Sequence, residues 1–200
     1  MVPQADKMSS PAQIPANLAR QLGLEARRSL SPEQRRQMSS AVSRRILSIG
    51  VVAGAKVLCG YSALADEVDL RDLYEAFRAQ GSSLCLPRIS VERLEFVGWQ
   101  AGSELGTNRF GIGEPVGEPE ALDSIEVIVL PCAAVDASGT RVGLGAGFYD
   151  RTLAGIAELD SPPLLVGAAF DAQLLEAIER RDWDVPLDVV VTEKRTIRTT

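Results

Sequence analysis

Five short apolar runs, separated by segments of helical periodicity, constrain the fold of this chain more than any other feature. Several of them are apolar at consecutive positions, which is the pattern of strands buried on both faces. Such strands need helices on each side. The sequence therefore predicts an α/β fold with an open, largely parallel sheet in three layers, helices on both faces and a Rossmann-like arrangement. The runs cover residues 55–61, 83–87, 124–131, 163–170 and 187–193.

Helical segments alternate with these runs. Ser31-Pro32-Glu33-Gln34 is a capping box with proline at the first helical position. Asp66 is the expected N-cap of the helix that follows the first run. Five helices are predicted: from residue 17 to a stop at 29–32, from 32 to about 50, from 66 to 81, through 153 and 156, and over 171–181.

Three other segments complete the predicted organisation. Residues 93–99 alternate weakly between apolar and polar, which suits an edge or hairpin strand. Residues 102–120 are rich in glycine and proline and form a long loop of the kind that often carries function. Residues 1–15 are polar and contain three prolines, so we expect a disordered tail, with residues 16–200 as one α/β domain.

Histidine is absent from the sequence, which excludes Ser-His-Asp hydrolases, Cys-His proteases and HExxH metalloproteases. The net charge of −6 argues against a nucleic-acid partner but leaves room for a local basic pocket. Three scattered cysteines and no CxxC argue against zinc and a disulfide framework and favour a reducing, cytoplasmic location. We expect no membrane partner, since no apolar run approaches the length of a membrane span.

The sharpest local signal is a glycine-rich segment, RVGLGAGFYDR, at residues 141–151. Gly143, Gly145 and Gly147 alternate just before a helix, so successive backbone N–H groups can turn toward one anion. Arg141 and Arg151 add positive charge on either side. The segment is neither a Walker A loop nor a GxGxxG fingerprint, and the preceding predicted strand lies about ten residues away. Phosphate binding and a simple flexible turn both remain open on the loop alone.

The stretch LPCAAVDASGTRVGLGAGFYDRTL resembles the signature of the 5-formyltetrahydrofolate cyclo-ligase family, also called methenyltetrahydrofolate synthetases. The family signature reads, roughly, PxxAFDxxGxRLGxGxGYYDR, and mild departures occur at Val135, Val142 and Phe148. The positions that are kept are Pro131, Asp136, Gly139, Arg141, Gly143, Gly145, Gly147, Tyr149, Asp150 and Arg151.

The resemblance extends over most of the chain. It includes the segments LARQLGLEARRSLSPEQR, DEVDLRDL, SLCLPRI, GIGEP, GAAFDAQLL and DVPLDVVVTE, in the family's order. Two departures are larger: Ala16 stands where the family has a lysine, and Trp183 where it has a histidine. The missing lysine bears on affinity for ATP.

The resemblance implies an enzyme that converts 5-formyltetrahydrofolate into 5,10-methenyltetrahydrofolate with ATP and Mg²⁺. It assigns catalytic contacts to Arg141 and Tyr149, and the two metal carboxylates to Asp150 and Asp184. The implied ATP-binding residues are Arg20, Arg141, Val142, Gly143, Leu144, Gly145, Ala146, Gly147, Phe148 and Tyr149. The implied folate contacts are Ser62, Glu67, Leu144, Gly145, Ala146, Gly147 and Phe148.

Each of these residues also has a structural interpretation. Glu67 and Asp150 fall in predicted first helical turns, where a carboxylate complements the helix dipole. Arg20 suits a solvated helix face, and Tyr149 suits the core. Trp99 and Trp183 are expected to pack in the core rather than line a folate cleft.

Two other functions compete with the ATP-dependent cyclo-ligase. One is a non-catalytic folate- or nucleotide-binding paralogue, suggested by Ala16. The other is an unrelated α/β phosphotransferase that uses the same loop. The expected partners are small-molecule substrates, and the expected state is a monomer.

Overall fold

A computed structural model describes residues 12–100 and 102–199 of the chain, and its centre is a sheet of seven strands. The strand order is β12-β11-β9-β6-β1-β2-β3. The five inner strands run parallel, while β3 and β12 pair antiparallel at the two edges. The strands are β1 (Val57–Cys59), β2 (Ser83–Ser90), β3 (Arg93–Gly98), β6 (Val127–Pro131), β9 (Leu164–Ala168), β11 (Val189–Val191) and β12 (Thr196–Arg198).

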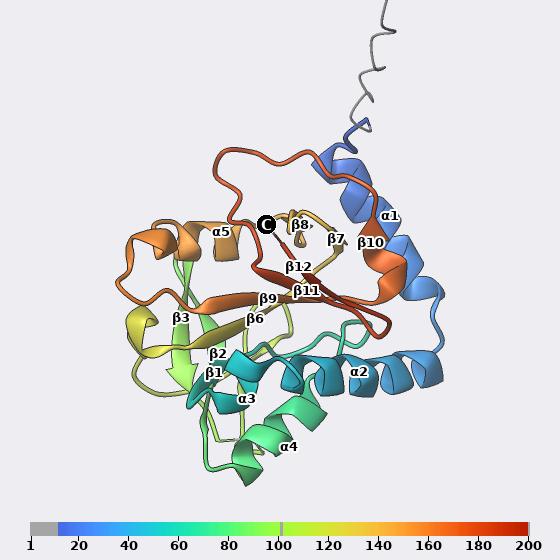
Figure 1. Cartoon of the computed structure of the whole chain (residues 1–200). Coiled ribbons are helices and arrows are strands. Elements are labelled where there is room, and N and C mark those ends of the chain that lie inside the picture. The colour runs from blue at the N-terminus through green and yellow to red at the C-terminus, as the bar shows by residue number, and fades with distance from the viewer. Residues whose placement is uncertain (1–11, 101, 200) are drawn as a thin grey trace, which may run out of the picture.

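Helices cover both faces of this sheet, which confirms the predicted three-layer α/β fold (Figure 1). On one face lie α2 (Pro32–Leu47), α3 (Gly50–Gly54) and α4 (Arg71–Ala79). On the other face lie α5 (Phe148–Leu153) and a small sheet, over which α1 (Ala16–Ser29) packs. The small sheet has the order β10-β7-β8 and consists of β7 (Ala134–Asp136), β8 (Arg141–Val142) and β10 (Leu174–Leu175).

The core follows the consecutive apolar positions of the central strands. Val127 and Val129 of β6 point to the α2–α4 side, and Ile128 and Leu130 point to the α5 side, all fully buried. Alternate residues of one strand thus enter two separate clusters, as a strand covered on both faces requires. The capping box at Ser31 forms as predicted, since the Ser31 hydroxyl accepts from the Gln34 N–H and the Gln34 side chain accepts from the Ser31 N–H.

Helix α1 approaches the small sheet very closely at Gly23. A Cβ atom at that position would lie 2.0 Å from the carbonyl oxygen of Ala133 and 2.9 Å from the Ala134 Cβ. Only glycine allows this distance between helix and strand. The close contact fixes the position of α1, which carries one of the predicted site residues, Arg20.

The helix predicted over residues 171–181 is wrong. A 3₁₀ turn at Asp171–Gln173 leads instead into β10, which pairs in parallel with β7. Ile178 bridges to Ile14, and the N–H of Ile178 donates to the buried carboxylate of Asp136. The apolar spacing of this segment is therefore used in backbone pairing, because partners from distant parts of the chain outcompete the local helix.

Other boundaries also differ from the prediction. Helix α4 starts at Arg71 with Leu70 as its N-cap, so Asp66 does not cap it. The second predicted helix ends at Leu47, and the short α3 follows it. The strand at 187–193 is followed by the edge strand β12, and the glycine segment begins with the short strand β8. The two remaining 3₁₀ turns are Leu122–Ser124 and Ile156–Glu158, and the predicted loop at 102–120 carries a small hairpin of β4 (Gly106–Thr107) and β5 (Gly113–Glu114).

Most of the predicted N-terminal tail lies outside the described residues. Within 12–15, Ile14 exchanges backbone hydrogen bonds with Ala177 and Glu179, so the paired chain starts before the expected boundary at residue 16. Among the helices of the described chain, none has the length and apolar character needed to cross a membrane.

Candidate active site

A cleft of about 1600 Å³ opens where the glycine segment, α1 and the loop after β1 meet. It receives the carboxyl ends of β6 and the segment after β1, which is where open parallel sheets usually bind ligands. Every site residue predicted from the sequence lines this cleft. They are Arg20, Ser62, Glu67, Arg141, Val142, Gly143, Leu144, Gly145, Ala146, Gly147, Phe148, Tyr149, Asp150 and Asp184.

The glycine segment starts with β8 and ends within α5. Gly145 and Gly147 have φ angles of 105° and 67°, a left-handed region that favours glycine. The Arg20 Nε donates to the carbonyl oxygen of Gly143 at 2.8 Å, which fixes the loop to α1. Arg20 therefore faces the cleft, and its interpretation as a solvated helix residue is wrong. Because α5 has only six residues, most of the positive charge available to an anion comes from arginine side chains.

Arg141 is buried at the base of the cleft. Its Nη2 donates to Asp150 Oδ1 at 2.7 Å, and its guanidinium lies 5.7 Å from the centre of the Tyr149 ring. The Arg141 Nε has no hydrogen-bond partner among the described residues. Burial raises the pKa of Tyr149 well above its ordinary value, so its hydroxyl is neutral and can donate. A buried cation with an unused N–H is suited to an anionic ligand in this cleft.

Asp150 and Asp184 come from segments that touch. The N–H of Val185, next to Asp184, donates to Asp150 Oδ1 at 3.3 Å. The Asp184 carboxylate accepts from the N–H of Arg181 at 2.9 Å. In the described part of the chain, no three His, Cys, Asp or Glu residues gather around a common point. Two carboxylates completed by water and phosphate oxygens are nevertheless a usual donor set for Mg²⁺, so the residues fit that ion.

Glu67 lines the cleft from the loop between β1 and α4. Its Oε2 accepts from the Leu64 N–H at 3.0 Å, and its Oε1 lies 3.4 Å from Arg27 Nη1. Burial raises its pKa, and the Leu64 hydrogen bond and the Arg27 charge oppose that rise. Glu67 does not lie in a helical turn, so the helix-dipole interpretation is wrong. Asp150 does lie in the first turn of α5.

Sequence reasoning missed several residues of the cleft. Phe110 and Ile112, from the loop at 102–120, line it beside Ile89 of β2. The sequence signal that could have identified these two residues was the expectation that the long loop at 102–120 carries function. Trp183, expected in the core, is 67% exposed at the cleft. Trp99 packs edge-on against Tyr74 as predicted, with ring centres 5.6 Å apart.

An open α/β sheet with a glycine segment and arginine side chains beside its strand ends is the arrangement of phosphate-binding α/β proteins. A sequence model of the 5-formyltetrahydrofolate cyclo-ligase family matches residues 16–193. The chain belongs to this family.

Individual relatives agree with this assignment. The chain is 34% identical to the 5-formyltetrahydrofolate cyclo-ligase of Escherichia coli K12, over 86% of this chain and 96% of that one. It is 32% identical to the enzyme of the same name from Mycolicibacterium smegmatis, over 87% and 91% of the two chains. The 5,10-methenyltetrahydrofolate synthetase of Aquifex aeolicus superimposes with a TM-score of 0.78 at 33% identity, covering 92% of each chain. A synthetase from Mycoplasma pneumoniae, at 18% identity and a TM-score of 0.72, shares the fold.

Proposed function

We propose that this protein is a 5-formyltetrahydrofolate cyclo-ligase, which forms 5,10-methenyltetrahydrofolate with consumption of ATP and release of ADP and phosphate. The observation that carries the proposal is that one cleft collects every residue which the family resemblance assigns to ATP, folate and metal. The relatives support the reaction, since those of at least 30% identity carry this enzyme's name.

The chemistry explains the need for ATP. The formyl group on N5 is amide-like, so its carbon is a weak electrophile and its oxygen a poor leaving group. Transfer of the γ-phosphoryl group to that oxygen, with loss of ADP, makes the oxygen a good leaving group. The N10 lone pair then attacks the carbon, phosphate departs, and N10 loses its proton. Such a reaction depends on positioning and charge neutralisation, for which no histidine is needed.

The phosphate end of the cleft belongs, in this proposal, to α1 and the glycine segment. Arg20 and the backbone N–H groups from Val142 to Tyr149 hold the ATP phosphates, and Arg141 neutralises charge on the transferring group through its unused Nε. The neutral hydroxyl of Tyr149 donates to a substrate oxygen. Ala16 also lines this end, so Arg20 stands there without the lysine found in the family.

The carboxylates of Asp150 and Asp184 hold Mg²⁺ in this proposal. When bound, the ion supplies neutralisation of phosphate charge. The hydrogen bond from the Val185 N–H keeps Asp150 beside the segment of Asp184, and Arg141 keeps the Asp150 side chain oriented toward the cleft.

The folate end belongs to Glu67 and Ser62 together with the glycine segment from Leu144 to Phe148. Glu67 accepts hydrogen bonds from the donor-rich pterin ring, which is a strong interaction for an ionised carboxylate. The apolar side chains of Ile89 and Phe110 then contact the aromatic middle of the substrate.

The test is incubation of the purified chain with 5-formyltetrahydrofolate, ATP and Mg²⁺ while the methenyl chromophore and ADP are followed. Product is expected only when all three are present. Arg20→Gln should raise KM for ATP more than KM for folate, because Arg20 contacts the phosphates directly in this proposal and reaches the folate contacts only through its bond to Gly143. Arg28→Gln is the matched control, because Arg28 lies on the same helix and is 69% exposed. Tight folate binding without product at saturating ATP would instead establish the non-catalytic paralogue.

We also propose a cytoplasmic monomer. Cys59, Cys85 and Cys132 are free and buried in the core, as in a protein that works in a reducing compartment. Light scattering on the purified chain checks the monomer, and cell fractionation checks the compartment. A dimer at enzyme-assay concentration, or recovery outside the cytosol, would contradict these assignments.

A further inference from the structure

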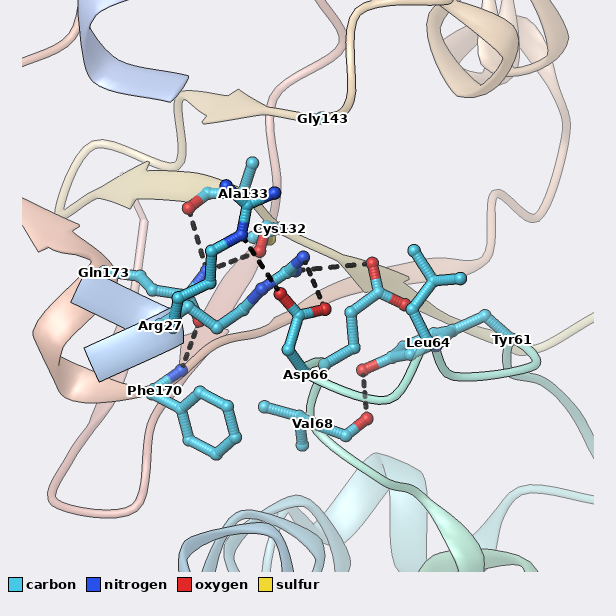
Figure 2. Close-up of polar contacts among 12 residues, drawn as sticks. Arg27, Tyr61, Leu64, Asp66, Val68, Cys132, Ala133, Gly143, Phe170 and Gln173 are labelled. Carbon is cyan, nitrogen blue, oxygen red and sulfur yellow. Dashed lines mark hydrogen bonds and ion pairs between the residues drawn. The ribbon is translucent and has the colours of Figure 1, made fainter. Parts of the chain in front are cut away.

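Arg27 is a buried cation that the reaction scheme does not use. Its side chain, on α1, is 2% exposed, and Figure 2 shows it turned toward Asp66 in the loop after β1. The Arg27 Nη2 lies 3.0 Å from Asp66 Oδ1, and its Nη1 lies 3.4 Å from Glu67 Oε1. One guanidinium therefore holds two neighbouring carboxylates. Its Nε has no hydrogen-bond partner among the described residues.

Glu67 is the carboxylate of this group that reaches the cleft. Burial raises its pKa, and so does the nearby charge of Asp66. The Leu64 N–H and Arg27 are the groups that lower it. The other titratable groups that face it are Tyr61 in the same loop, Tyr149 on α5 and Cys132 after β6, each of which also gains a raised pKa from the Glu67 charge. Burial leaves these three neutral. The exposed Arg28 lies 3.8 Å from Asp66, so Arg27 is the cation paired directly with Glu67.

Loss of the Arg27 charge would change the chemistry of Glu67. An arginine keeps its charge at all accessible pH values. Without it, two adjacent carboxylates would share a poorly solvated site, and one of them would take up a proton. A protonated carboxyl presents a donor where the pterin ring also presents donors.

We infer that Arg27 is a positioning residue for folate: it holds Glu67 ionised and oriented so that its oxygens accept hydrogen bonds from the pterin ring. The inference rests on the proposed function. It also gives α1 a double role, because Arg20 and Arg27, two turns apart on one face, serve the phosphate end and the folate end of the same cleft.

The first experiment measures the charge on Glu67 without turnover. The titration of its side-chain carboxyl is followed by ¹³C NMR in the free protein, with Glu67→Gln identifying the resonance. Arg27→Gln should raise the midpoint by about one pH unit or more, the usual effect of losing a close opposite charge. Arg36→Gln, at an arginine of α2 that is 63% exposed and pairs with Glu33, should leave it in place. An unchanged midpoint in a folded Arg27→Gln protein would overturn the inference.

Two further variants keep the test decisive if Arg27→Gln does not fold. Arg27→Lys retains a positive charge and should keep the midpoint close to that of the wild type. Asp66→Asn removes the competing carboxylate and should lower the midpoint, the opposite direction. If Asp66→Asn leaves the Glu67 midpoint unchanged, the three charges are not coupled and the inference fails.

The second experiment separates a positioning role from a merely structural one. Arg27→Gln should raise KM for 5-formyltetrahydrofolate about tenfold at neutral pH and leave KM for ATP unchanged. In the pH profile of kcat/KM for folate, the acidic limb should move to higher pH by the same amount as the NMR midpoint. Arg27→Lys should restore most of the folate KM. Equal effects on both substrates with an unshifted limb would show a structural role only. If the wild-type protein makes no product, the proposed function fails, and the NMR titration still decides whether Arg27 holds the charge on Glu67.

Discussion

Replacement of Gly23 by alanine tests how closely α1 is fitted to the small sheet. The new Cβ would lie 2.0 Å from the Ala133 carbonyl oxygen, whereas ordinary contact begins at 3.4 Å. Helix α1 would therefore have to move away by about 1.4 Å. The same oxygen accepts a hydrogen bond from Gln173 Nε2 at 2.8 Å, so the methyl group also competes with that contact.

The expected cost is the difference between two opposing effects. Overpacking of this kind costs about 1–3 kcal/mol, and a weakened buried hydrogen bond adds about 1 kcal/mol. Alanine gains about 1 kcal/mol over glycine in helix propensity. The net expectation for Gly23→Ala is a loss of about 1–3 kcal/mol in the free energy of unfolding. Movement of α1 also draws Arg20 away from the Gly143 carbonyl, now 2.8 Å away, so kcat/KM for ATP should fall about tenfold or more.

Urea denaturation measures the change in the free energy of unfolding, and steady-state kinetics measure the change in kcat/KM for ATP. Gly54→Ala is the control, because Gly54 is also a helical glycine and a Cβ atom added there would meet no atom outside its own helix within 4 Å. Gly54→Ala should be neutral or slightly stabilising, with unchanged kinetics. If Gly23→Ala behaves like Gly54→Ala in both assays, the argument from close contact is refuted.

Three other substitutions test separate parts of the structure. Asp136→Ala should cost about 3 kcal/mol or more in urea, because the buried N–H groups of Thr140 and Ile178 lose their acceptor; a loss under about 1 kcal/mol would contradict this. Glu67→Gln should change the pH dependence of stability. Burial raises the pKa of Glu67 in the folded protein above 4.5. The stability that Glu67 contributes is therefore complete below pH 4.5 and is lost as the pH rises through the folded pKa. Urea midpoints measured from below pH 4.5 to above the folded pKa should show the wild type losing stability relative to Glu67→Gln. Parallel curves for the two proteins would exclude a raised pKa of Glu67. Asp150→Asn should lower turnover about tenfold or more with partial recovery in excess Mg²⁺, and full activity at limiting Mg²⁺ would remove Asp150 from the metal site.

The parts of this fold that depend on neighbouring residues, or only on burial, could be predicted from the sequence. The capping box at Ser31 depends on neighbours in the chain, and it forms where the sequence predicts it. The consecutive apolar positions of β6 depend only on burial on two faces, so the sheet could also be predicted.

Partners from distant parts of the chain decided the rest. Residues 171–181 have helical apolar spacing, yet they pair with β7 and with Ile14. Asp66 has the sequence context of an N-cap but instead contacts Arg27, 39 positions earlier. Arg27 itself looks like any arginine on a helix, and its burial arises only from the fit of α1 to the loop after β1. The family resemblance located the cleft residues because it carries information about such distant contacts.

The bond between Arg20 and Gly143 joins residues 123 positions apart, and Asp184 enters the cleft from a segment that follows Arg20 by 164 positions (184 − 20). During synthesis α1 emerges before the strands β7 and β8 on which it packs, which are made more than one hundred residues later. Contacts of such high sequence separation slow folding, since the chain must close long loops before it gains them. The end of the cleft formed by Arg20 and the glycine segment therefore assembles only after that segment has been made, and a nascent chain that ends before residue 141 lacks the strand and glycine segment on which α1 rests.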